Sequence, residues 1–261
     1  MAATLLALWV GTEPLAGADS PQGPKAPANT LDYGEPKLLT GTIYEPGSNP
    51  PKVLFKFRRT ATRSGSTIRV LREYNDPDGT PAARERVVYE ADKLATYELE
   101  ELQIDGKGSA TRRKDPKTDK EKICFEYIKG RAPGAKKQVS NEALQKDALL
   151  NDTIAPFLAG HWEALMHGQP VKFRYIVIPR TETVGFKLVK ESETTWQGKP
   201  AVRIKMEPTS VVIAALVDPL FFTVEKEGEH RVLEYAGRTT PKIKVGNKWK
   251  DLDALTVFDW K

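Results

Sequence analysis

Residues 151–170 read NDTIAPFLAGHWEALMHGQP, and their apolar side chains recur at intervals of three and four residues. That spacing places the apolar side chains on one stripe of a helix with 3.6 residues per turn. Asp152 or Thr153 is expected to cap the first turn, and Gly168 with Pro170 is expected to end the helix. The stretch therefore predicts one amphipathic helix whose apolar stripe must be covered by other elements. The stripe consists of Ile154, Phe157, Leu158, Trp162, Leu165 and Met166.

The residues that follow this helix alternate between apolar and polar side chains, which is the period of a half-buried β-strand. Val171, Phe173 and Tyr175, for example, alternate with Lys172 and Arg174. Short turns marked by Gly and Pro separate these runs, as they do between antiparallel strands joined by hairpins. The sequence therefore predicts five or six antiparallel strands that cover the helix.

The chain before the helix shows the same alternation of apolar and polar side chains. Turn sequences interrupt it, such as Asn75-Asp-Pro-Asp-Gly79, in which Pro fixes one turn dihedral and Gly accepts the left-handed one. Phe55 and Phe57 are expected to lie in one inward row. Residues 112–122 are charged and have no apolar period, so they are expected to form a long exposed loop. The first half is therefore predicted to be a meander of antiparallel strands.

The first 36 residues differ from the rest in composition. Residues 1–18 are predicted to be a signal peptide, because the apolar run Thr4 to Val10 is too short to span a bilayer and Ala16-Gly17-Ala18 resembles a cleavage site. No Lys or Arg precedes that run, so a start further upstream and an ordinary N-terminal tail are the alternatives. Residues 19–36 are predicted to be a disordered arm rich in Pro, Gly and Ala. Residues 37–261 are expected to form a single antiparallel β domain, located in the periplasm or secreted.

Charge and motifs limit the classes of function. The chain has 40 Lys and Arg against 35 Asp and Glu, a mild excess that favours anionic membrane surfaces or acidic ligands. It carries no nucleotide-binding, thiol-redox or serine-hydrolase motif. His161 and His167 lie about 240° apart around the helix axis and cannot share a metal ion. The residues therefore predict no metal site, no cofactor and no catalytic constellation.

The apolar segment Val211–Phe222 contains a single charged residue, Asp218. A continuous apolar strand must be covered on both faces or must line a hydrophobic cavity. A strand buried between sheet and helix is the first interpretation, and a strand that lines a ligand cavity is the alternative. One sheet with one helix has difficulty covering both faces, which motivates the cavity hypothesis. The predicted lining residues are Phe157, Trp162, Leu165, Met166, Phe173, Tyr175, Phe221 and Phe222.

Several arginines gather around one predicted hairpin. Arg58, Arg59 and Arg63 are candidates for binding a lipid head group or an anionic polymer. A nucleic-acid partner is not expected, because Phe55 and Phe57 belong to an inward row and the chain is predicted to be exported.

Four stretches carry a similarity to a known family: GQPVKF (168–173), TETVGFKL (181–188), WQGKPAVR (196–203) and FTVEKEGEHRVLEY (222–235). Together with the helix they resemble an uncharacterised exported family of the bacterial envelope, related in architecture to the lipoprotein-localisation carriers. The resemblance implies a strongly curved antiparallel sheet, or half-barrel, whose concave face is closed by a helix and holds acyl chains. It implies no catalytic residues.

We therefore predict a mainly β protein, in which a curved antiparallel sheet (half-barrel) carries one principal amphipathic helix on its concave face. The predicted function is non-catalytic binding of an apolar or amphiphilic envelope ligand, such as a lipid or a lipoprotein-like molecule. The expected partner is that ligand or an envelope protein, and peripheral membrane contact is compatible with the charge. One alternative is a protein–protein scaffold that uses a sheet edge and the basic loop 112–122. A less favoured alternative is a hydrolase with dispersed carboxylates.

Overall fold

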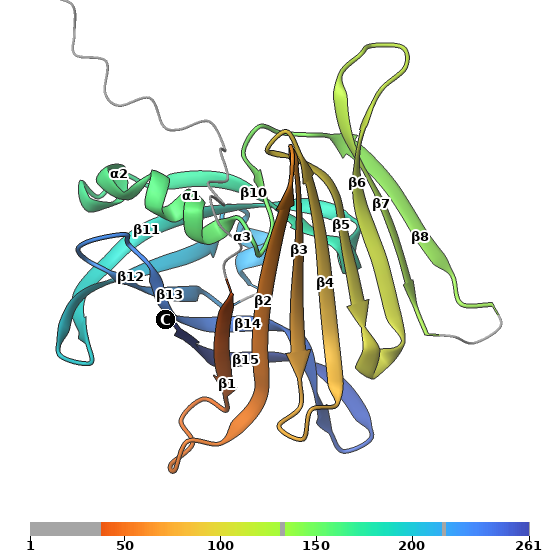
Figure 1. Ribbon diagram of the computed structural model, residues 1–261. Coiled ribbons are helices and arrows are strands. Elements are labelled where there is room, and N and C mark those ends of the chain that lie inside the picture. Colours follow the sequence, from red (N-terminus) through yellow and green to blue (C-terminus); the bar gives the residue numbers. More distant parts are fainter. Residues whose placement is uncertain (1–37, 131–133, 216–217, 261) are drawn as a thin grey trace, which may run out of the picture.

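The computed structural model describes residues 38–130, 134–215 and 218–260 (Figure 1). The predicted signal peptide (1–18) and the predicted arm (19–36) lie outside these residues. The described strands form one open sheet in the order β8-β7-β6-β5-β4-β3-β2-β1-β15-β14-β13-β12-β11-β10-β9. The fold is mainly β, and among the described strands only the pair of β9 and β10 is parallel. The predicted fold class is confirmed.

Strands that are consecutive in the chain are neighbours in the sheet, except β8 and β9, which lie at its two ends. The first meander comprises β1 (Leu39–Tyr44), β2 (Val53–Ser64), β3 (Thr67–Asn75), β4 (Pro81–Glu90), β5 (Lys93–Glu101), β6 (Gly106–Lys114), β7 (Glu121–Lys129) and β8 (Lys137–Ala143). The second comprises β9 (Ala148–Leu149), β10 (Val171–Val177), β11 (Glu182–Trp196), β12 (Lys199–Pro208), β13 (Leu220–Glu225), β14 (Val232–Val245) and β15 (Lys248–Asp259). Pairing of β1 with β15 joins the two halves, so the first and last strands lie in the middle of the sheet.

The predicted helix is present but divided into α1 (Ile154–Gly160) and α2 (Trp162–Met166), which lie over β10 and β11 in Figure 1. The division falls at Gly160, a poor helix former, and at His161, whose N–H bonds to the carbonyl of Leu158 in a tighter turn. The predicted side-chain cap is wrong. Thr153 occupies the N-cap position, but its hydroxyl bonds to the backbone of Leu150 and does not cap the helix. The carboxylate of Asp152 is engaged by Arg59.

Two further predictions about elements are wrong. The apolar segment Val211–Phe222 is not one strand, because it starts with the short helix α3 (Val211–Ala214). Pro219 has no backbone N–H, so the ladder with β12 begins only at Leu220. Residues 112–122 are not one long loop either, because their two ends continue β6 and β7, which pair across a turn.

The core falls into three apolar clusters, of which two matter for the site. One lies between α1–α2 and the concave face of β10 to β14, and is called here the helix–sheet cluster. The other lies on the inward face of β2 to β7. The end of β10 and the 3-10 turn η2 (Ile178–Arg180) that follows it reach into this second cluster through Ile176 and Ile178. This turn passes so close to β6 that a Cβ on Gly108 would lie 2.6 Å from Cγ2 of Ile178. The two halves of the sheet therefore pack against each other.

Candidate functional site

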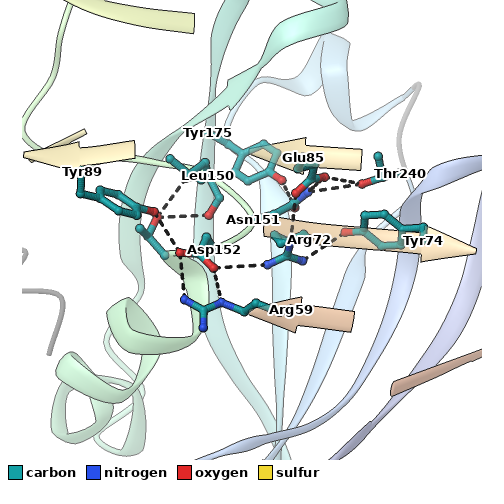
Figure 2. Close-up of polar contacts among 11 residues, drawn as sticks. Arg59, Arg72, Tyr74, Glu85, Tyr89, Leu150, Asn151, Asp152, Tyr175 and Thr240 are labelled. Carbon is teal, nitrogen blue, oxygen red and sulfur yellow. Dashed lines mark hydrogen bonds and ion pairs between the residues drawn. The ribbon is translucent and has the colours of Figure 1, made fainter. Parts of the chain in front are cut away.

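A buried polar cluster lies where the segment before α1 meets the first half of the sheet (Figure 2). Arg59 of β2, Arg72 of β3 and Glu85 of β4 stand directly opposite one another in the ladder. The two-residue period of the strands directs all three to the inward face. Like charges on opposite positions of neighbouring strands destabilise a sheet. The adjacent arginines therefore need more negative charge than Glu85 alone provides.

Asp152 supplies this second negative charge from the residue pair that precedes α1. Its side chain has 0% exposed surface. Arg59 donates to its carboxylate from Nε to Oδ1 at 2.5 Å and from Nη2 to Oδ2 at 3.2 Å, and the Tyr89 hydroxyl donates to Oδ2 at 3.1 Å. Nη1 of Arg72 lies 3.8 Å from Oδ1. Two guanidinium groups and two carboxylates thus balance, as buried charges require.

Glu85 is held by groups from distant parts of the chain. Nε of Arg72 lies 3.0 Å from its Oε2. Its Oε1 accepts hydrogen bonds from Nδ2 of Asn151 at 2.8 Å and from the hydroxyl of Thr240 at 2.6 Å. The Tyr175 hydroxyl in turn donates to Oδ1 of Asn151. Strands β3, β4, β10 and β14 therefore meet the segment before α1 in one connected network.

Thr240 reaches this network because β14 bulges. The ladder pairs Arg238 with Asp253 and Lys242 with Asp251, so three residues of β14 stand opposite one residue of β15. The last of these three residues is a proline, which has no N–H to donate to a ladder. The extra residues bend β14 and direct the Thr240 hydroxyl toward β4. The bulge in β14 thus provides the hydrogen bond from Thr240 to Glu85 in the ion cluster.

The electrostatic environment of Arg72 keeps its guanidinium charged. Burial by itself lowers the pKa of Arg72, but Tyr74, Glu85 and Asp152 together outweigh burial, and the pKa is held well above its usual value. Nη2 of Arg72 also donates to the Tyr74 hydroxyl at 3.2 Å. The guanidinium of Arg72 therefore stays positively charged inside the folded protein.

The buried tyrosines around the cluster predict a loss of stability in alkali. Burial raises the pKa of Tyr74, Tyr97 and Tyr175. The unfolded chain releases these protons near pH 10, whereas the folded protein retains them, so the unfolded state binds fewer protons above that pH. We expect the contribution of these tyrosines to the free energy of unfolding to be fully present up to about pH 9 and to fall above about pH 10, by about 1.4 kcal/mol for each pH unit and each buried tyrosine. Denaturant midpoints measured across this range, together with phenolate absorbance, check the prediction.

Tyr97→Phe is the informative variant for this pH dependence, because it removes one buried phenol and leaves its ring. We expect a shallower decline of the denaturant midpoint above about pH 10 than in the unaltered protein. Titration of all tyrosines near pH 10 in the folded protein, with an unchanged midpoint, would contradict the prediction.

The buried ion cluster holds strands and the segment before α1 in place, and its two carboxylates are not accessible to solvent. Both carboxylates, on Glu85 and Asp152, have 0% exposed side-chain surface and are engaged by arginines. The network ties residues 151–152 to strands of both halves of the sheet. It therefore determines where α1 begins relative to the first meander.

Sequence reasoning missed this cluster, although part of a signal is present. The two-residue period that makes Phe55 and Phe57 inward also makes Arg59 inward, and Glu85 lies between the buried residues Ala83 and Val87. A charged residue in an inward row indicates a buried partner. The partner itself cannot be read from the sequence, because 93 residues separate Arg59 from its carboxylate.

Most of the predicted lining residues lie together. Phe173 packs against Phe157 at a ring distance of 5.5 Å and against Phe186 at 6.1 Å. Phe221 is the exception, because it points to the opposite face of the sheet, where Arg203 lies 4.1 Å from its ring. The described side chains of the helix–sheet cluster therefore contact one another. The predicted lining residues in this cluster are Phe157, Trp162, Leu165, Met166, Phe173, Tyr175 and Phe222.

The predicted head-group arginines do not form one site. Arg59 is buried in the ion cluster, whereas its neighbour Arg58 is exposed on the other face of β2. Arg63 lies near the end of the strand, with Nη2 3.5 Å from the carboxylate of Asp92. The alternation of the strand separates Arg58 from the other two.

The predicted basic loop is largely neutralised by its own residues. Arg112 pairs with Glu121 at 2.9 Å and Lys114 pairs with Asp119 at 3.0 Å. A third pair of this hairpin joins Lys122 and Asp115 at 3.5 Å. The hairpin therefore presents less free positive charge than its sequence suggests.

A hollow of about 460 Å³ opens on the outward face of β2 to β5, away from the helices. Leu71 and Val88 lie in it beside polar side chains. This hollow was not predicted, and it contains none of the predicted site residues. Its polar lining residues are Thr60, Thr62, Arg69, Arg86, Thr96 and Glu98.

The described residues contain no group of three or more His, Cys, Asp or Glu side chains placed to hold a metal ion. His161 and His167 each place Nδ1 against a carbonyl of their own helical segment, at 2.8 and 2.7 Å. His230 stacks on Trp162, with ring centroids 4.1 Å apart. In the described part of the chain, no helix has both the length and the apolar character needed to cross a membrane.

Fold and site together define a mainly β protein with an open antiparallel sheet, an apolar helix–sheet layer and a buried ion cluster. Comparison with protein-family models, with curated proteins and with solved structures finds no match. The similarity to an exported envelope family therefore stays a prediction, and function has to be inferred from the geometry.

Proposed function

We propose that the protein binds an amphiphilic molecule without converting it, with the apolar part of the ligand resting on the helix–sheet cluster. One observation carries this proposal, namely an exposed apolar segment attached to that cluster. Val211 and Val212 of α3 are 86% and 73% exposed, whereas Ile213 packs against the cluster. Contiguous exposed aliphatic groups are unfavourable in water and are typical of an interaction site.

The free energy that holds α3 over the helix–sheet cluster is small enough for a ligand to displace it. Among the residues of α3, Ile213 makes the contact with the cluster, and the segment's first helical hydrogen bond, from the Ala214 N–H to the Ser210 carbonyl, is internal to it. Moving one half-buried isoleucine into water costs about 1–2 kcal/mol. Each methylene of an acyl chain that takes its place contributes about 0.8 kcal/mol. A chain of a few methylenes therefore outweighs the loss.

The position of α3 also favours an amphiphilic ligand over a wholly apolar one. Ile213 contacts the cluster, while the valines beside it face solvent. A ligand that replaces Ile213 has its apolar end on the cluster and its other end in water, where a polar head group needs no buried partner. If the chain is exported as predicted, lipids and lipoproteins of the cell envelope are the source of such molecules.

The test uses the full-length protein and a fluorescent fatty-acid analogue. We expect saturable binding, and we expect Val212→Asp to weaken it about ten-fold, because Val212 belongs to the exposed apolar segment that is proposed to contact the ligand, and a charge there offsets more than about 1 kcal/mol of apolar contact. Val139→Asp is the matched control, because Val139 is also a strongly exposed valine, 65% accessible, on β8. It should leave binding unchanged. No saturable binding, or equal weakening by both variants, would contradict the proposal.

A second candidate function is a protein scaffold that uses the edge of the sheet. Strand β8 ends the sheet in the described part of the chain, and exposed Val139 lies on it. An exposed edge offers unpaired backbone groups to a partner strand. The same two variants separate the candidates. Loss of a protein partner with Val139→Asp but not with Val212→Asp would favour the scaffold, since a charge on an edge strand opposes strand addition.

A further inference from the structure

The β14–β15 hairpin ends in a tip that combines free positive charge with exposed apolar groups. Lys244, Lys248 and Lys250 are exposed, and Val245 and Trp249 are 49% and 41% exposed. Within residues 38–130, 134–215 and 218–260, these three lysines form no ion pair with an acidic side chain. The tip therefore carries positive charge that a partner can neutralise.

The root of the hairpin is firmly held, so the tip is presented in a defined position. Nζ of Lys242 lies 2.9 Å from Glu101 and 2.7 Å from Asp251. The amide of Gln103 bonds to both backbone groups of Lys242, accepting from its N–H at 2.7 Å and donating to its carbonyl at 3.0 Å. Leu252 is buried next to these contacts. Little order has to be gained when such a tip binds a partner, which favours affinity.

The apolar groups lie on both faces of the hairpin, and this distribution indicates the kind of partner. Lys244 stands opposite Trp249 on one face, and Val245 stands opposite Lys248 on the other. Directly opposite residues share a face, and successive residues alternate between faces. A groove or a nucleic-acid strand would contact one face only. A medium that surrounds the tip, with anionic groups at its surface, would contact both.

We propose that this hairpin tip inserts into the head-group region of an anionic lipid bilayer. Tryptophan prefers that region, because its ring is apolar and its N–H is polar. Lysine stems lie along apolar groups while their ammonium groups reach lipid phosphates. The inference is independent of ligand binding at the helix–sheet cluster, since the hairpin is a separate part of the molecule.

The test is sedimentation of the full-length protein with phosphatidylcholine vesicles that do or do not contain phosphatidylglycerol. We expect binding only to the anionic vesicles. The triple variant Lys244→Gln, Lys248→Gln, Lys250→Gln should weaken it on the order of a hundred-fold, and Trp249→Ala roughly ten-fold. The matched control is Lys93→Gln, Lys117→Gln, Lys120→Gln, which removes equal charge from three exposed positions outside the β14–β15 hairpin. This control should lose much less affinity than the hairpin triple.

Three outcomes would overturn the inference. The first is equal binding to vesicles with and without phosphatidylglycerol. The second is equal weakening by the hairpin and control triples, which would indicate an effect of net charge alone. The third is binding to a single-stranded oligonucleotide that is tighter than binding to anionic vesicles. Unfolding midpoints of the variants should match that of the unaltered protein, because all substituted side chains are at the surface.

Discussion

Asp152→Asn is expected to lower the free energy of unfolding by about 3–5 kcal/mol. The substitution preserves shape and removes the charge that balances Arg59 at 2.5 Å and Arg72 at 3.8 Å. It leaves the two adjacent guanidinium groups with a single carboxylate, that of Glu85, which lies beside Arg72. Breaking a buried ion pair from one side is costly because the remaining charge is not solvated. Urea denaturation followed by circular dichroism measures the change.

The control for this prediction is an ion pair of the same chemistry at the surface. Glu100 pairs with Arg86 at 2.9 Å, with 35% and 42% of the side chains exposed. Glu100→Gln should change the free energy of unfolding by less than about 1 kcal/mol. Equal denaturation midpoints for the two variants would show that the buried cluster contributes no more than a surface pair.

A paired replacement tests whether the cluster acts through charge balance. Arg59→Met combined with Asp152→Leu removes one charge of each sign and keeps side-chain volume. Apolar replacements of whole buried ion pairs are frequently neutral. We expect the double variant to be more stable than Asp152→Asn, since Arg72 and Glu85 remain a balanced pair at 3.0 Å.

Phe173→Ala is expected to cost about 3–5 kcal/mol of folding free energy. Phe173 is 2% exposed and packs against Phe157 and Phe186 in the helix–sheet cluster. Its removal takes away buried apolar surface and leaves a cavity that the surrounding sheet fills only in part. The melting temperature and the denaturant midpoint should both fall.

Phe221→Ala is the matched control, because Phe221 is also a predicted lining residue but points to the outward face beside Arg203. It should cost far less than Phe173→Ala. The same pair tests the proposed function, since the space left by Phe173 lies where an acyl chain is proposed to bind. A fatty acid should raise the melting temperature of Phe173→Ala, because ligand that binds only the folded state stabilises it. Equal losses in both variants would contradict the assigned position of Phe173.

Local periodicity predicted the elements better than their ends. The apolar stripe in residues 154–166 required a helical segment, and the alternation in residues 171–177 required a strand, because each pattern buries its apolar side chains in one geometry only. The division of the helix at Gly160 depends on a single tight turn. The start of the strand at Leu220 depends on Pro219 and on the pairing with β12. A few local interactions decide where such elements end, and the spacing of apolar residues carries no information about those interactions.

The site was predictable in part only. The period of β2 makes Arg59 inward, but the prediction placed that side chain among exposed arginines, since nothing in the neighbouring sequence supplies an anion. The sequence by itself determined the class of fold, the helical segment and most of the residues in its apolar layer, because burial follows from spacing along the chain. Only the tertiary structure decided that Asp152 neutralises Arg59 and that Thr240 reaches Glu85. These partners lie 93 and 155 residues apart in the chain, and charge compensation at such separation depends on how the two meanders pack.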